Sequence, residues 1–135
     1  MATIKLEIVT PEAKTYSEDV NMVTLTGTEG EMGILPGHMN LMTQLVAGEI
    51  LVNKDGQTIS LAVGDGFVQV TGERVAVLTD MAIRAENIDE VAAEQARQRA
   101  VARFAEKLTE EEAATVEAAL AHATAQLKVK QRHKR

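Results

Sequence analysis

The sequence predicts an α+β fold: a β domain over residues 1–84, then an antiparallel helical hairpin over residues 87–129. Three observations predict it. Apolar residues alternate with polar ones up to about residue 80, turn-forming residues recur every ten or so positions, and a long stretch after residue 87 lacks glycine and proline. Short period-two runs separated by regular turns are typical of a β-sandwich or barrel.

The strands are marked by their alternating apolar residues, which would face one core. Turn signals separate them at Asn53–Gly56, where glycine can take positive φ, at Gly64–Gly66 and at Thr71–Glu73. The alternating apolar positions are Ile4, Leu6 and Ile8; Val23 and Leu25; Ile50 and Val52; Ile59, Leu61 and Val63. Two further strand-like runs follow, over residues 67–70 and 74–78.

Two helices follow the strands. We expect Asn87 to cap the first, which would run over residues 88–107, with Glu90 three positions after the cap. After a break near Leu108, residues 109–112 read as a capping box that opens the second helix. Its apolar residues recur at spacings of three and four in one narrow stripe: Ala113, Val116, Leu120, Ala123 and Leu127.

The hairpin is rich in alanine between residues 92 and 125, so it buries little apolar area. We therefore expect it to be marginal alone and weakly docked, which would suit a switch. A plain α+β domain with a fixed hairpin fits the same pattern.

Charge is distributed unevenly along the chain. The formal net charge is −6, yet the basic tail over residues 130–135, together with Lys128, makes the chain end positive. We expect that end to be a solvated, frayed helix terminus, although contact with an anionic partner or a membrane would fit the same charges. The acidic body argues against a nucleic-acid partner. No cysteine is present, the N-terminus lacks the pattern of a signal peptide, and no apolar stretch is long enough to span a bilayer.

Candidate catalytic groups are sparse. His38, His122 and His133 are not at metal-binding spacing, and neither Ser17 nor Ser60 lies in a nucleophile motif. The glycine-rich residues 27–33 lack the lysine of a phosphate-binding loop, and Glu29 and Glu31 would repel phosphate. The two carboxylates could form a paired site, but solvated loop charges fit better. We expect a loop over residues 27–40 whose apolar side chains form a contact surface: Met32, Ile34, Leu35, Pro36 and Met39.

Four segments resemble one family. Residues 30–38 read Gly-Glu-Met-Gly-Ile-Leu-Pro-Gly-His, residues 8–11 read Ile-Val-Thr-Pro, and residues 66–70 lead into Val-Ala-Val-Leu-Thr-Asp at 75–80. Together they resemble the epsilon subunit of the F-type ATP synthase over the whole chain. The resemblance implies a flattened sandwich of about ten strands and a two-helix hairpin.

This resemblance also implies a non-catalytic rotor subunit of the central stalk. The sandwich would bind the gamma subunit and the c-subunit ring, with Glu31 and His38 in a loop at the ring-facing end. The hairpin would fold on the sandwich, or extend towards the alpha and beta subunits and inhibit ATP hydrolysis. Membrane association would be peripheral, at the cytoplasmic face of a bacterial plasma membrane or at a plastid thylakoid. The implied contact residues are Glu29, Glu31, Gly33, Ile34, Leu35, Pro36, Gly37 and His38.

Some members of the family bind regulatory Mg-ATP through a motif at the start of the first helix. Here Ile88, Asp89 and Ala93 match that motif, but Ala92 replaces its arginine. Losing an arginine hydrogen bond, roughly 1.5–3 kcal/mol, would weaken binding about 10- to 100-fold. Members of the family that bind ATP also use basic residues on the second helix. Here residues 113–127 contain no Lys or Arg, and His122 and Gln126 stand at the positions equivalent to those basic residues. Two other basic residues could contribute, Arg84 and Arg99. We expect weak or absent ATP binding and no other cofactor.

Two further interpretations are open from sequence. A free-standing ATP-sensing module would combine the β domain with a helical lid, and a small enzyme would need a catalytic set that the sequence does not offer.

Overall fold

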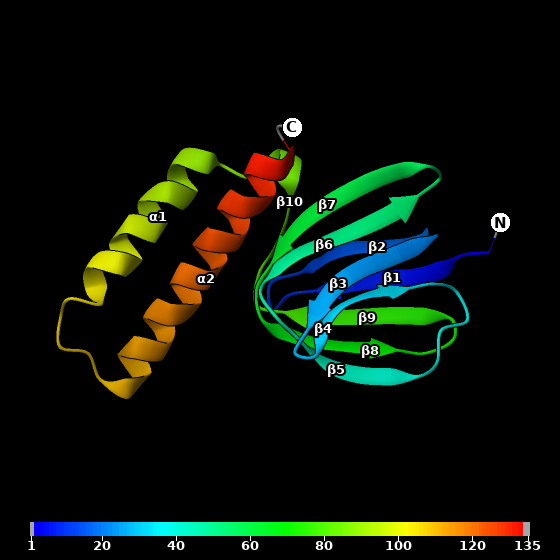
Figure 1. Ribbon diagram of the computed structural model, residues 1–135, viewed down its shortest axis with the longest axis horizontal. Helices are drawn as coiled ribbons and strands as arrows, with labels where there is room; N and C mark the ends of the chain where they lie inside the picture. Colours follow the sequence, from blue (N-terminus) through cyan, green and yellow to red (C-terminus); the bar gives the residue numbers. More distant parts are fainter. Residues whose placement is uncertain (1, 134–135) are drawn as a thin grey trace.

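The computed structural model describes residues 2–133 and contains ten strands followed by a short 3₁₀ helix and two α-helices (Figure 1). The expected sandwich of about ten strands followed by a helical hairpin is confirmed. The strands are β1 (Ile4–Val9), β2 (Lys14–Val20), β3 (Met22–Gly27), β4 (Gly30–Ile34), β5 (Leu41–Leu45), β6 (Gly48–Lys54), β7 (Gln57–Val63), β8 (Gly66–Val70), β9 (Arg74–Thr79) and β10 (Ala82–Arg84).

All ten strands belong to one curled sheet, in the order β10-β7-β6-β3-β5-β8-β9-β1-β2, with β4 paired to β3. Neighbours are antiparallel except β1 and β9, which run parallel. The sheet folds over itself, so the inward residues of its two halves share one core.

Among the described residues, the main hydrophobic cluster consists of aliphatic side chains and one tyrosine. The alternating residues that the sequence pattern placed inside the sandwich are buried, apart from Ile59, which is partly buried. Leu25 and Val52, for example, have no exposed surface. Tyr16, on a strand that the alternation did not reveal, is also buried.

The helical part begins with a 3₁₀ turn, η1 (Ala85–Asn87), followed by α1 (Glu90–Arg103) and α2 (Glu110–His133). The expectation that Asn87 caps the first helix is wrong. Asp89 is the cap, and its carboxylate accepts a hydrogen bond from the Ala92 backbone N–H at 3.0 Å. Asn87 is taken up by the 3₁₀ turn because Ile88 is held extended and buried against the sandwich.

The two helices also differ in how well their ends match expectation. The first stops at Arg103, four residues before the expected Lys107, and turns follow it. The second opens with the expected capping box. Thr109 Oγ1 accepts from the Glu112 N–H at 3.1 Å, and Glu112 Oε1 accepts from the Thr109 N–H at 3.1 Å.

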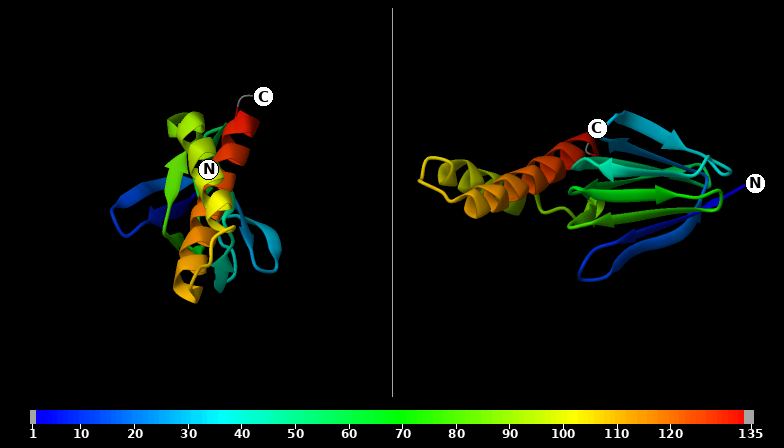
Figure 2. Two further views of the ribbon diagram at one scale, coloured as in Figure 1. Left: turned by 90° about the vertical axis from the view of Figure 1, so that its left-hand side faces the viewer. Right: turned by 90° about the horizontal axis from the view of Figure 1, so that it is seen from below.

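The hairpin docks through one end of α2. The C-terminal half of α2 lies against β6 and β7, while α1 packs chiefly on α2. A small second core joins hairpin and sandwich: Ala62, Ala85, Ile88, Ala125 and Val129. The loop between the helices projects away from the strands in Figure 1 and in the right-hand view of Figure 2. The apolar stripe expected on α2 is incomplete, because Ala125 and Val129 form a second buried face of this helix that the stripe omits.

Candidate functional site

Residues 27–40 contain a strand rather than one long loop. Strand β4 pairs with β3 through the register Val23–Ile34 to Gly27–Gly30. Ile34, which the sequence placed on a contact surface, is fully buried because its side chain faces the sandwich core. It is therefore not available to a partner.

The expected single contact loop is divided between two ends of the sandwich. Glu29 lies in the β3–β4 turn, where the Thr28 N–H donates to Gln44 O at 3.2 Å, and Glu31 follows at the start of β4. His38 lies beyond the other end of β4, where the Gly37 N–H donates to Gly72 O at 3.1 Å. Glu31 and His38 therefore do not share one loop. Positive φ angles at Gly30 (120°) and Gly37 (82°) explain the glycines of these two turns.

The His38 end of the sandwich exposes apolar side chains. Leu35 is 55% exposed and Met39 is 81% exposed, while the ring of His38 is within 2.8 Å of Met39 O through Nδ1. This end is an apolar tip, and it lies opposite the helical hairpin (Figure 1).

An exposed apolar sheet face, which the sequence analysis did not identify, lies on β5, β8 and β9. Phe67 and Leu78 are directly paired across β8 and β9, and each is 54% exposed. Met42 on β5 is 69% exposed. These three residues occupy outward positions of their strands, where polar residues are usual. Apolar residues out of phase with the core alternation were the signal that could have revealed this face.

The candidate nucleotide residues do not form one site. Ile88 and Ala93 are buried, and the Asp89 carboxylate caps α1. Arg99 is exposed on α1, ten residues after Asp89, or about 15 Å along the helix. Arg84 lies over the ring of Tyr16 on another part of the sandwich.

A groove of about 400 Å³ between the two helices begins where α1 starts. Its lining includes two carboxylates and no Lys or Arg. Arg97 lowers the pKa of Glu94, so this carboxylate stays ionised at neutral pH. An acidic groove disfavours the phosphates of a nucleotide. The lining residues are Glu90, Val91, Glu94, Gln95, Gln98, Leu127 and Gln131.

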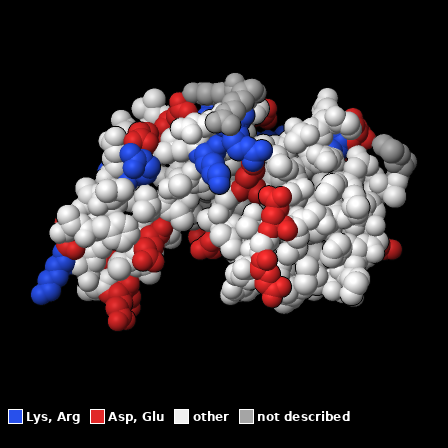
Figure 3. Space-filling model, in the orientation of Figure 1, with Lys and Arg blue, Asp and Glu red and all other residues white. Residues whose placement is uncertain are grey.

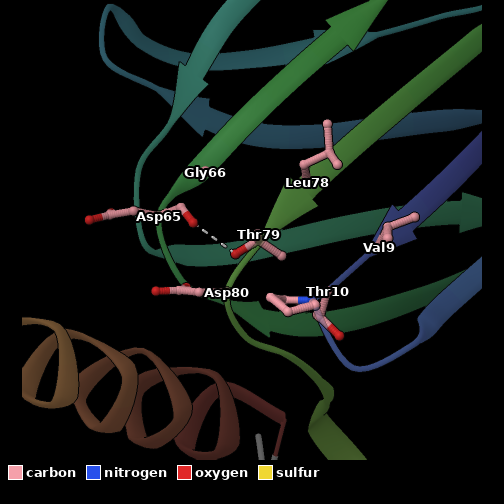
Figure 4. Close-up of a pocket in the computed structure, with 8 residues that line it drawn as sticks. Val9, Thr10, Asp65, Gly66, Leu78, Thr79 and Asp80 are labelled. Carbon is pink, nitrogen blue, oxygen red and sulfur yellow. Dashed lines mark hydrogen bonds between the residues drawn. The ribbon is translucent and has the colours of Figure 1, made fainter.

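A second hollow, of about 340 Å³, lies at the hairpin end of the sandwich (Figure 4). Val9 and Leu78 form its apolar wall, and the carboxylates of Asp65 and Asp80 point away from that wall. Asp65 Oδ1 accepts from the Ala47 N–H at 2.9 Å, and Asp80 contacts a histidine on α2. No cluster of His, Cys, Asp and Glu that could hold a metal occurs within residues 2–133.

The basic end of α2 is attached to the sandwich, contrary to the expectation of a solvated, frayed terminus. Lys130 Nζ donates to Ala85 O at 3.2 Å, and Arg132 pairs with Glu49 on β6. Glu49 also accepts from Ser60 Oγ at 2.5 Å. Figure 3 shows basic side chains beside the end of α2 with acidic side chains next to them. The remainder of the basic tail, residues 134 and 135, lies outside the described residues.

The fold places this chain in the class of β-sandwich proteins with a C-terminal helical hairpin, here with an exposed apolar sheet face. Residues 3–85 match the family model "ATP synthase, Delta/Epsilon chain, beta-sandwich domain". Residues 86–131 match "ATP synthase, Delta/Epsilon chain, long alpha-helix domain". The chain belongs to the ATP synthase delta/epsilon chain family, as an epsilon-type, non-catalytic subunit of the complex. Membership confirms the resemblance drawn from the motif at residues 30–38.

Individual relatives agree with the family match. The ATP synthase epsilon chain of Dehalococcoides mccartyi (strain CBDB1) is 45% identical over 136 residues, covering 100% of this chain and 97% of the relative. That of Bacillus subtilis (strain 168) is 44% identical over 104 residues, covering 77% of this chain and 79% of the relative.

Two solved assemblies contain similar structures. A chain of the Euglena gracilis mitochondrial ATP synthase, solved with OSCP, F1 and c-ring, superposes with a TM-score of 0.77 at 27% identity, covering 97% of this chain and 82% of that one. A Tetrahymena thermophila central stalk and c-ring structure gives 0.66 at 10% identity, covering 96% and 97% respectively, and so shows the fold alone. Within the described residues, neither helix is both long and apolar enough to cross a bilayer.

Proposed function

We propose that this chain is a rotor subunit of the central stalk of a proton-translocating ATP synthase. Its sandwich would couple the gamma subunit to the c-subunit ring, and its hairpin would regulate ATP hydrolysis. The observation that carries the proposal is the exposed apolar face of Met42, Phe67 and Leu78, in a chain that belongs to the epsilon family. Exposed apolar clusters mark protein interfaces.

The two partners would use different parts of the sandwich. The apolar sheet face offers a broad, flat area of the kind that packs against another folded subunit, and we assign it to gamma. The tip with Leu35 and Met39 lies at the end opposite the hairpin, and we assign it to the c-ring. Glu29 and Glu31, at the other end of β4, are then left out of the ring contact.

Regulation by the hairpin is supported by the small apolar contact between the hairpin and the sandwich. Three of the five buried residues in the connecting cluster are alanines, so the docked form is held by a small contact and a few polar bonds. Such an element can exchange between a docked and an extended placement at modest cost. In the extended placement it would contact the alpha and beta subunits.

Regulatory Mg-ATP would bind weakly. Ala92 replaces the motif arginine, the groove beside it is acidic, and Arg84 is engaged elsewhere. We propose a peripheral location at the cytoplasmic face of a bacterial plasma membrane, reached through the complex, in keeping with the bacterial relatives.

Binding to purified gamma subunit tests the coupling role. Phe67→Glu and Leu78→Glu should each weaken the complex at least tenfold, because a charge would be buried in an apolar interface. Val101→Glu is the matched control, since Val101 is also an exposed apolar residue but lies on α1. Binding of gamma that is unchanged by both sheet-face variants would contradict the assignment of this face.

Hydrolysis by the assembled complex tests the regulatory role. Deleting residues 86–135 should raise the rate of ATP hydrolysis if the hairpin inhibits. An unchanged rate would show that the hairpin of this chain does not act as an inhibitor.

A further inference from the structure

We infer that Asp80 and His122 form a latch that holds the helical hairpin on the sandwich, and that Gly64 makes room for it. His122 Nε2, on α2, lies 3.0 Å from Asp80 Oδ1, in the connection between β9 and β10. The side chain of His122 is 27% exposed and that of Asp80 is 49% exposed, so the contact is shielded from water mainly on the histidine side. The inference depends on the proposed function only for its consequence in the assembled complex.

Gly64 lies directly under this pair. A Cβ atom at position 64 would overlap Asp80 Oδ1 and would lie 2.7 Å from His122 Nε2. The backbone cannot retreat easily, because the Gly64 N–H donates to Met81 O at 2.9 Å and Gly64 O accepts from Thr79 Oγ1 at 2.9 Å. The φ angle of Gly64 is not in the left-handed region, so its conformation does not require glycine. What the position requires is the space in which the latch forms.

The latch adds a second point of attachment along α2. The other polar attachments, from Lys130 to Ala85 O and from Arg132 to Glu49, lie eight and ten residues later. At 1.5 Å per residue they are about 12–15 Å away along the helix. A helix held only at its end can pivot, whereas two separated points fix its direction. His122 therefore sets the angle at which the hairpin lies on the sandwich.

Polar contacts matter here because the apolar contact is small. The connecting cluster contains three alanines, which bury little area, beside Ile88 and Val129, and Met81 and Ile83 are only partly buried against it. The latch needs no bound nucleotide, since both partners belong to this chain. In the assembled complex, loss of the latch would favour the extended placement of the hairpin even without any change in bound nucleotide.

The docking equilibrium can be measured on the isolated full-length chain. The sequence has no cysteine, so spin labels at Gln69→Cys and Lys107→Cys, both exposed positions, report the separation of the sandwich and the hairpin tip. Pulsed electron–electron double resonance then gives the distance distribution between the two labels, and from it the populations of the docked and undocked forms. Asp80→Ala and His122→Ala should each raise the undocked-to-docked ratio roughly two- to fivefold, as expected for the loss of one partly exposed polar side-chain contact.

Gly64→Ala supplies the decisive comparison. In the parent chain it should raise the ratio by a similar factor, since the new methyl group displaces Asp80 from His122. In the Asp80→Ala/His122→Ala background it should change the ratio by less than about 1.5-fold, because the atoms it displaces are gone. A merely structural effect of the methyl group would persist in both backgrounds. Asp19→Ala, an exposed carboxylate on β2, is the matched control and should leave the ratio unchanged.

The inference is overturned if Asp80→Ala and His122→Ala leave the distance distribution unchanged. It is also overturned if Gly64→Ala acts equally in both backgrounds. Both measurements are independent of gamma binding. The proposed coupling role can therefore be contradicted while the latch is supported, and the latch can be contradicted while the coupling role is supported.

Discussion

The guanidinium carbon of Arg84 lies 5.3 Å from the centroid of the Tyr16 ring. Arg84 is on β10 and Tyr16 on β2, the strands at the two edges of the curled sheet. The same arginine is 3.9 Å from Glu86. From the sequence alone, Arg84 is a candidate contact for a nucleotide. Its position over Tyr16 gives it a structural role in joining β10 to β2.

Replacing Arg84 should therefore affect stability. Arg84→Gln should lower the free energy of unfolding by about 0.5–1 kcal/mol, the usual value of a cation–π contact near the surface. Urea denaturation measures the change. Arg99→Gln is the control, because Arg99 is an exposed arginine on α1, and it should have almost no effect. Equal effects of the two substitutions would argue against the contact.

Tyr16 should titrate at unusually high pH. Burial, followed by the neighbouring Glu18 carboxylate, raises the pKa of Tyr16 to about 12. A raised pKa means that the folded state favours the neutral phenol, so this stabilisation is complete below about pH 10 and is lost as pH rises towards 12. Tyr16 is the only tyrosine and the chain has no tryptophan, so tyrosinate absorbance reports this one group. A midpoint near 10 in the folded chain would contradict the burial argument.

Central strands could be predicted because their alternation is long and faces one core. Leu25 and Val52 illustrate this, as both are fully buried. Edge strands could not be predicted in the same way. Of the side chains that the structure describes in Lys14–Val20, only Tyr16 and Val20 are buried, among charged neighbours, and Ala82–Arg84 is too short to show a period.

Sites were harder to predict because they depend on long-range pairing. The Gly30–His38 motif identified the family, but only the pairing of β4 with β3 shows that Ile34 points inward. Two neighbouring residues, Asn87 and Asp89, can each cap a helix, and burial of the residue between them decides the choice. The contact between Asp80 and His122 joins residues 42 positions apart, a relationship that no local pattern contains.

Docking of the hairpin should depend on Ile88. This side chain is 4% exposed in the cluster between hairpin and sandwich. Ile88→Ala should cost about 2 kcal/mol, the low end for such truncations, since the small cluster can partly collapse. Hydrogen exchange should show faster exchange of the α2 amides while the β3 amides stay protected. Uniformly faster exchange in sandwich and hairpin would instead show that the two parts unfold as one unit.

The start of α2 should be sensitive to acid. The backbone N–H of Thr109, followed by its hydroxyl, lowers the pKa of Glu112. A lowered pKa means that the stabilisation is present above about pH 4.3, the unfolded value, and is lost as pH falls through the lower folded value. Glu112→Gln should remove this acid dependence, as followed by the NMR shifts of the first α2 turn. Thr109→Ala should cost about 1 kcal/mol at neutral pH through loss of the cap.

Mg-ATP should bind this chain poorly, and restoring one arginine should not rescue it. Calorimetry should detect no saturable binding at low micromolar ATP, because Ala92 offers no side-chain donor, the lining of the adjoining groove has two carboxylates and no Lys or Arg, and the nearby Arg97 is paired with Glu94. Ala92→Arg adds one charge-assisted hydrogen bond, so it should improve affinity by at most about 10- to 100-fold. Adding Gln98→Arg, in the groove lining, should improve binding further, because it places a second positive charge against the phosphates. Micromolar affinity in the unaltered chain would show that the nucleotide binds elsewhere, and that the acidic groove does not prevent ATP binding.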